Sequence, residues 1–144
     1  MKRFFSILLG LSILAIAGSD RFYRIDDKKV VVDTTTNLMW QDDEDSNATK
    51  RTWIDAINYC DNLTLGNYSD WRLPNFNELY DLSYRDKADP ALDDTFINVS
   101  SIKYWSSTTV VKNEDLSWGI NFYDGSGFWS AKTHTNAVRC VRVK

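Results

Sequence analysis

The chain has 144 residues, of which 43% are hydrophobic and 26% are charged, and its net charge at pH 7 is −3. This length is typical of one folded domain. The acidic balance argues against nucleic acid and strongly anionic polymers as partners, because such binding depends on clustered Lys and Arg, although a local basic patch would escape this argument.

Residues 1–17 have the layout of a bacterial secretory signal peptide. Two basic residues precede an apolar run, and small residues follow up to Ala17. We expect cleavage after Ala17, which leaves one domain over residues 18–144. The alternative is an uncleaved anchor, but about 13 apolar residues are fewer than the roughly 20 that span a bilayer. We therefore expect a periplasmic or extracellular protein that has no membrane contact after cleavage.

Short strands are predicted first, over residues 22–25, 30–33 and 38–41, because these segments are rich in β-branched and aromatic residues. The acidic run Asp42–Asp45 follows them. It has no apolar partner in its pattern, so we expect a solvated loop there.

Two helices are predicted next. The first begins after Thr52, whose side chain can cap the first turn. Its apolar stripe consists of Trp53, Ala56, Ile57, Cys60 and Leu63. The second begins after Asn75, which has the spacing of a capping box with Glu78, and it buries Leu79 and Leu82.

A long structured loop is expected over residues 83–101, anchored by Leu92, Phe96 and Ile97. The chain then returns to strands. The predicted segments are 104–107, 118–122, 127–131 and 137–143. The glycine-rich stretch Asp124–Gly127 between two of them predicts a tight turn, since glycine reaches positive φ without steric cost. Strands, two helices and strands again indicate an α+β fold.

Cys60 and Cys140 are the only two cysteines. An even count in an exported protein predicts one disulfide, which would tie the first helix to the last strand. Closing a loop of about 80 residues stabilises a fold by on the order of 4 kcal/mol in the chain-entropy treatment. A redox pair is the weaker hypothesis, because the two cysteines are not in a Cys-x-x-Cys arrangement.

Several blocks of this sequence resemble the Lcl C-terminal domain family, long described as a domain of unknown function. The blocks are 38–41, the helix through Trp53 and Cys60, 70–75 with Glu78 and Leu79, 104–108 and 138–142. The resemblance implies a C-type-lectin-like fold, related to that of the formylglycine-generating enzymes. Such a fold has two helices, mainly antiparallel strands and long loops, and one disulfide closes it.

The name of the family comes from an adhesin domain that binds sulfated polysaccharides, and the acidic balance of this chain weakens that implication. Asn37 stands where the family usually has glycine, a change that asparagine tolerates because it also visits the left-handed region. No collagen-like stem precedes the domain, so the adhesin's trimer is not implied and the oligomeric state stays open.

Catalytic motifs are not recognisable. His134 is the only histidine, and no Gly-x-Ser-x-Gly element presents a serine nucleophile. A zinc site is not expected with so few soft ligands. The formylglycine-generating enzymes depend on a cysteine pair near the end of the domain, where this chain offers only Cys140. We therefore expect a protein that is not an enzyme.

Calcium is the one cofactor that the acidic run could hold. Asp42, Asp43, Glu44 and Asp45 supply hard oxygen ligands. The run lacks the glycine and the final glutamate of an EF-hand loop, and it lacks the Glu-Pro-Asn or Gln-Pro-Asp signature of calcium-dependent lectins. We therefore favour a solvated loop without metal.

The late loops carry the candidate ligand face. Trp40, Trp53, Trp71 and Trp105 fall in the family blocks and are expected in the core, and Trp118 is expected to be buried with its strand. Rigid aromatics beside polar groups suit a sugar or a protein epitope. The predicted ligand-binding residues are Tyr123, Asp124, Ser126, Phe128, Trp129, Lys132, His134 and Asn136.

Our first hypothesis is an exported recognition module that binds a saccharide or a surface protein through these loops. The second is a structural or accessory subunit of an envelope assembly. An enzyme is the third.

Overall fold

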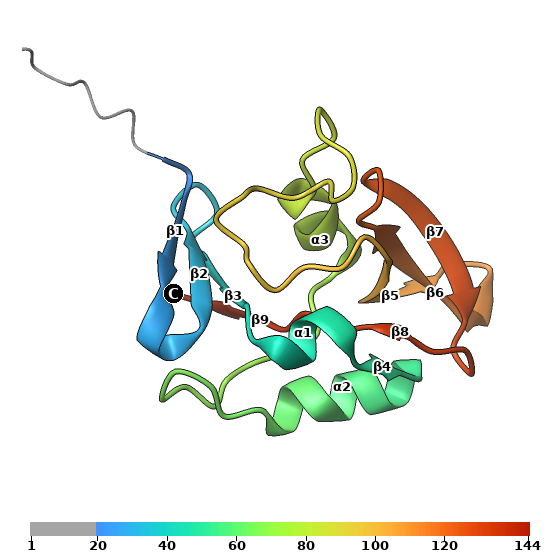
Figure 1. Cartoon of the computed structure of the whole chain (residues 1–144). Coiled ribbons are helices and arrows are strands. Elements are labelled where there is room, and N and C mark those ends of the chain that lie inside the picture. The colour runs from blue at the N-terminus through green and yellow to red at the C-terminus, as the bar shows by residue number, and fades with distance from the viewer. Residues whose placement is uncertain (1–19) are drawn as a thin grey trace, which may run out of the picture.

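The computed structural model describes residues 20–144 and has an α+β fold with two mostly antiparallel sheets (Figure 1). The expected signal peptide lies outside these residues. Within them, no helix has the length and apolar composition that crossing a membrane requires. The last strand and the start of the described chain lie on the same side of the molecule, opposite β7 (Figure 1).

The first sheet has the order β1-β2-β3-β9. Its strands are β1 (Phe22–Ile25), β2 (Val30–Asp33), β3 (Leu38–Gln41) and β9 (Val141–Val143). The three early strands are confirmed with the predicted bounds. In the turn before β3, Asn37 has a φ of 57°, so asparagine does take the left-handed conformation at this position.

The second sheet has the order β4-β8-β5-β6-β7. Its strands are β4 (Lys50–Arg51), β8 (Asn136–Ala137), β5 (Lys103–Val110), β6 (Asn113–Asn121) and β7 (Ser126–Ala131). β5 and β6 extend further than the sequence predicts, and they form a long hairpin. β7 is an edge strand that pairs only with β6.

The predicted strand over residues 137–143 is wrong as a single element. β8 ends at Ala137 in the second sheet and β9 begins at Val141 in the first, so the C-terminal segment joins the two sheets (Figure 1). Arg139 lies between them with a fully buried side chain that pairs with Asp42. A pattern of apolar residues cannot reveal that crossover, because the chain is buried without interruption from Asn136 through Val141.

The two predicted helices are confirmed as α2 (Trp53–Asn62) and α3 (Phe76–Leu82). The Thr52 side chain accepts a hydrogen bond from a backbone N–H of the first turn of α2. Asn75 and Glu78 form the predicted capping box of α3. Both helices therefore begin where their cap residues predict.

The acidic run is not a solvated loop. It contains a further helix, α1 (Glu44–Ala48), which is capped by the Asp43 side chain. Asp42 is fully buried, where it pairs with Arg24 and Arg139. The prediction failed because the two basic partners lie far from the run in sequence. A single 3-10 turn, η1 (Asp26–Lys28), joins β1 to β2.

The predicted disulfide is confirmed. Cys60 and Cys140 are bonded, with their Cα atoms 5.5 Å apart and a sequence separation of 80 residues. Both are fully buried. The bond ties α2 to the residue that precedes β9, and so it holds the helix against the crossover between the sheets.

The core has two clusters, one on each side of β5. Tyr104 belongs to the cluster that contains α3 residues, whereas Trp105 belongs to the cluster that contains α2 and the disulfide. Neighbouring residues of a strand face opposite ways, which explains the division. Of the expected loop anchors, Leu92 and Phe96 are buried, but Ile97 is 66% exposed. Ile97 instead donates its backbone N–H to Asp42, so its side chain points outward.

Candidate functional site

The four acidic side chains of the expected calcium run are turned toward different partners. Asp42 accepts from the backbone N–H groups of Ile97 and Asn98, in addition to its arginines. Asp43 caps α1, Glu44 pairs with a lysine at 3.2 Å, and Asp45 accepts from a tyrosine hydroxyl. Among residues 20–144, no group of three or more His, Cys, Asp or Glu side chains is arranged to hold a metal ion.

The predicted ligand-binding residues do not form one surface. Phe128 and Trp129 are neighbours in β7, so their side chains lie on opposite faces of the second sheet. The Phe128 ring packs on Trp105, with centroids 6.4 Å apart, on the side of α2. The Trp129 ring packs on Trp118 on the side of α3. The structure therefore offers two separate candidate sites.

The first candidate is a connected row of rings, which we call the aromatic row. It consists of Trp129, Trp118, Phe76 and Tyr80. Successive ring centroids lie 5.6, 5.5 and 5.7 Å apart. Trp129 is 62% exposed and Tyr80 is 39% exposed, whereas the two rings between them are half-buried. The row thus has a half-buried middle and two exposed ends.

Trp118 is not fully buried, which departs from the sequence prediction. Ile120 and Phe122, its neighbours on the same face, are completely buried. Trp118 lies further along β6, where its ring fills the space between Phe76 and Trp129. A half-buried ring in this position supports the exposed one.

Sequence reasoning missed Phe76 and Tyr80, since they belong to α3 and lie about 40 residues before Trp118. Their spacing of four residues on a helix is the one signal that pairs them. Their rings are stacked, with an angle of 19° between the planes. The Arg85 guanidinium lies 4.0 Å from the Tyr80 ring centroid and covers the end of the row.

α3 is held firmly against the sheet. The Phe76 backbone N–H donates to Thr108 Oγ1 in β5, at 2.9 Å. Arg72 donates two hydrogen bonds to Glu78 in the first turn of α3, at 2.7 and 2.6 Å. Burial alone would raise the pKa of Glu78, but the bonds from Arg72 and the Asn75 N–H hold it below its ordinary value. The aromatic row is therefore built on a fixed base.

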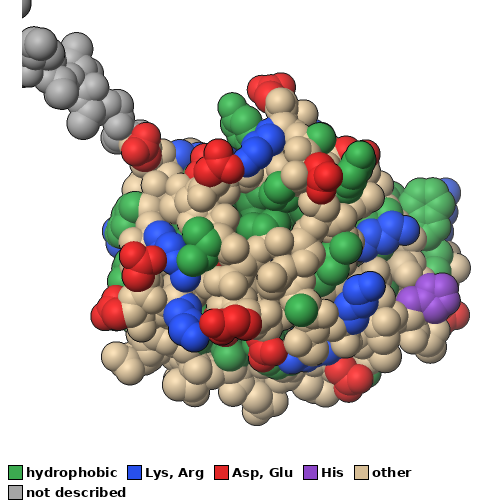
Figure 2. Space-filling model, in the orientation of Figure 1, with side chains coloured by type: hydrophobic (Ala, Val, Ile, Leu, Met, Phe, Trp, Pro, Cys, Tyr) green, Lys and Arg blue, Asp and Glu red, His purple; other side chains and the backbone are tan. Residues whose placement is uncertain are grey.

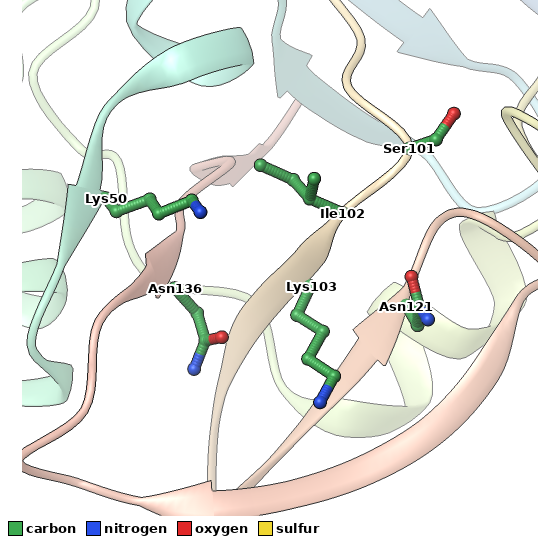
Figure 3. Close-up of a pocket in the computed structure, with 6 residues that line it drawn as sticks. All are labelled: Lys50, Ser101, Ile102, Lys103, Asn121 and Asn136. Carbon is green, nitrogen blue, oxygen red and sulfur yellow. The ribbon is translucent and has the colours of Figure 1, made fainter.

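The second candidate is a pocket of about 290 Å³ at the start of β5 and the end of β6, which we call the lysine pocket (Figure 3). Its lining residues are Lys50, Ser101, Ile102, Lys103, Asn121 and Asn136. Asn136 alone was predicted. In Figure 3, Asn136 and Lys103 extend in the same direction from neighbouring strands, and Lys50 reaches toward Ile102 from β4. Strand alternation places Lys103, Asn121 and Asn136 on the face opposite Trp129.

The remaining predicted residues lie around these sites without joining them. Tyr123 is 52% exposed. Ser126 donates its hydroxyl and backbone N–H to Asp124, and these bonds hold the pKa of Asp124 below its ordinary value. Gly125 takes a φ of 80° in the predicted turn. Lys132 Nζ lies 4.0 Å from the Trp53 ring centroid.

His134 is exposed, and its Nδ1 lies 3.2 Å from Ser130 Oγ. Within residues 20–144, no carboxylate bonds to this imidazole, whereas a catalytic base is oriented by a third group. Figure 2 shows the histidine and basic side chains beside hydrophobic ones at the right of the front face, where β7 lies in Figure 1. The second sheet is thus where aromatic, basic and polar groups gather at the surface.

The model of the Lcl C-terminal domain family matches residues 29–142. This range covers the strands from β2 to β8, the helices α1, α2 and α3 and the disulfide, and it ends within β9. A search of curated proteins found no match.

Proposed function

The chain belongs to the Lcl C-terminal domain family, and we propose that it is an exported, non-catalytic recognition module that binds a saccharide on the aromatic row. The observation that carries this proposal is the exposed Trp129 ring, which is 62% exposed and is held at a steep angle by Trp118. A large apolar ring kept in water favours contact with a partner.

The geometry of the row suits a sugar. A pyranose presents an apolar face of C–H groups that packs on an aromatic ring, while its hydroxyls bond to polar groups around the ring. Trp129 offers such a ring and Tyr80 adds a hydroxyl at the far end of the row. Because Trp118 and Phe76 support these rings from below, little side-chain entropy is lost on binding.

A protein partner is the second candidate, and the same ring supports it. Tryptophan and tyrosine are enriched in the energetic centres of protein interfaces. An accessory subunit of an envelope assembly would bury Trp129 and the neighbouring half-buried rings against a partner. Export is part of both proposals, and the buried disulfide is consistent with an oxidising compartment.

The test is a glycan array probed with the purified protein and with two variants. Trp129→Ala removes the exposed ring, and Ile54→Ala removes a 56% exposed side chain from α2, outside the row. We expect glycan binding by the native protein and by Ile54→Ala, and a loss of about tenfold or more in Trp129→Ala, which corresponds to about 1.4 kcal/mol.

An array without any hit contradicts saccharide binding. Cross-linking in cells that recovers one envelope protein, dependent on Trp129, would then favour the accessory subunit. Equal loss in both variants would contradict the aromatic row as the binding surface. Sequencing the N-terminus of the exported protein checks the expected start at residue 18.

A further inference from the structure

The lysine pocket has the size of a site for one small molecule. Its volume of about 290 Å³ stands at the lower end of the range for small-molecule sites. It is formed where β4, β8, β5 and β6 begin or end, so four separate segments contribute to its walls. Backbone pairing of these strands fixes the positions of the lining residues.

The charge of the pocket is positive. Lys50 and Lys103 line it, and no acidic side chain does. Neither lysine forms an ion pair with any of residues 20–144, whereas Arg72, Arg139 and Arg142 are all bonded to carboxylates. Lys103 Nζ lies 5.0 Å from the Phe128 ring centroid, a contact that leaves its charge without a carboxylate. Two uncompensated charges in an acidic protein favour an anion at this point.

Two side-chain amides add hydrogen-bonding groups. The Asn121 Oδ1 accepts the Tyr123 N–H at 3.1 Å, which leaves the amide N–H groups of Asn121 free to donate. Asn136 is 8% exposed and its Nδ2 has no hydrogen-bond partner. Native folds rarely leave a buried amide unpaired. Since no bond holds Nδ2, the amide can turn and donate to a ligand without losing a bond within the protein.

The lining favours a single carboxylate over a sulfated polymer. No arginine fork and no helix N-terminus lines this pocket, so its donors are two lysine ammonium groups and two side-chain amides. A polymer with many charges needs an extended basic surface, but the net charge of the chain is −3. Two ammonium groups and two amides, in a pocket with room for one small molecule, suit a small anion such as a carboxylate.

We propose that the lysine pocket binds a small carboxylate of the size of one sugar acid, held by Lys50 and Lys103 and oriented by Asn121 and Asn136. This site lies apart from the aromatic row. The proposal does not depend on saccharide binding at Trp129, and each site has its own test.

The test is a titration of the purified protein with D-glucuronate, followed by the NMR signals of the side-chain amides of Asn121 and Asn136. We expect both signals to shift with a saturable profile. Methyl β-D-glucoside, which is neutral, should leave them unchanged, and D-glucose 6-sulfate should bind at least tenfold more weakly. Equal or tighter binding of the sulfate ester overturns the carboxylate assignment.

Matched variants distinguish binding in the lysine pocket from a general effect of positive charge on the protein. The double variant Lys50→Gln/Lys103→Gln removes the two exposed charges, and we expect at least a tenfold rise in Kd. Lys112→Gln removes one charge from the exposed tip of the β5–β6 hairpin and should leave the Kd unchanged, as should Trp129→Ala. A Kd that the double variant does not change overturns the proposal.

A further arm identifies the source of the carboxylate. Methyl β-D-glucuronide mimics a sugar acid at the end of a glycan, whereas D-glucuronate is the free acid. Equal binding of the two supports a glycan terminus, and binding of the free acid alone supports a soluble metabolite. The absence of amide shifts with either compound overturns the proposal.

Discussion

The two sheets of this protein differ sharply in how they meet solvent. Every residue of β2 and β3 in the first sheet is buried, whereas every residue of β7 in the second sheet is exposed or half-buried. The first sheet lies against core clusters on both faces. The second ends in an edge strand that carries Trp129. The comparison teaches that the first sheet is enclosed by the core, whereas the outer strands of the second sheet remain open to solvent.

The largest expected effect concerns the buried carboxylate that follows β3. Asp42→Ala should cost about 3–5 kcal/mol of unfolding free energy, because it leaves the buried Arg139 without its carboxylate partner. Arg139 is fully buried, whereas Arg24 is half-buried and keeps its ion pair with Asp26. Urea denaturation followed by tryptophan fluorescence measures the change. Glu44→Ala removes an exposed carboxylate of the same acidic run and should change the unfolding free energy little. Equal losses in Asp42→Ala and Glu44→Ala would contradict this prediction.

A smaller loss is expected inside the second sheet. A Cβ at position 119 would lie 2.2 Å from the Tyr104 carbonyl oxygen and 2.6 Å from the Phe128 ring. Gly119→Ala should therefore cost about 1–3 kcal/mol, since backbone must move. Gly127→Ala is the matched control in β7, where the nearest atom is 3.2 Å away on the Phe76 ring and can shift. In differential scanning calorimetry, the Tm of Gly119→Ala should lie well below that of Gly127→Ala. A higher Tm for Gly119→Ala than for Gly127→Ala would contradict this prediction.

The pH dependence of stability tests the ion pair between Arg72 and Glu78, which fixes α3 beneath the aromatic row. Burial opposes ionisation of Glu78, but the Arg72 and Asn75 hydrogen bonds prevail and depress its pKa in the folded state below the usual 4.5. A depressed folded-state pKa stabilises the protein above pH 4.5, and this stability is lost as the pH falls through the folded-state value. In Glu78→Gln, the Tm should fall less steeply as the pH is lowered from 5 through the folded-state pKa of Glu78. Glu114→Gln, which is exposed, should leave that decline as it is.

The smallest expected effect concerns Trp129. Trp129→Ala should lower the unfolding free energy by less than about 1 kcal/mol, because most of the side chain is already in water. Chemical denaturation measures this value. A loss above about 2 kcal/mol would show that the ring stabilises the sheet rather than serving a partner, and it would remove the contrast between the two sheets.

Local signals in the sequence predicted a large part of this fold. Thr52 and Asn75 mark the starts of α2 and α3, since cap residues act within one helical turn. The early strands follow from runs of β-branched and aromatic residues, and the turn at Gly125 from its glycine. The prediction of the cysteine pair needed only an even count and the expectation of export. Each of these features depends on few residues that are close in sequence.

The errors have a common cause. The burial of Asp42 depends on Arg139, the exposure of Ile97 depends on its backbone bond to Asp42, and the break between β8 and β9 depends on the two sheets. The division of the late loops between two faces has the same origin. Phe128 and Trp129 are adjacent in sequence, but alternation in β7 directs one to α2 and the other to α3.

The sequence alone determined the family, the α+β class, the helix starts and the cysteine pair, because these depend on local chemistry and on motifs in a fixed order. Only the tertiary structure decided which side chains share a surface. Phe76 packs on Trp118, and Lys50 lines the same pocket as Lys103, across more than 40 residues of chain. Such contacts arise from packing of the helices and pairing of the strands, which no local pattern encodes.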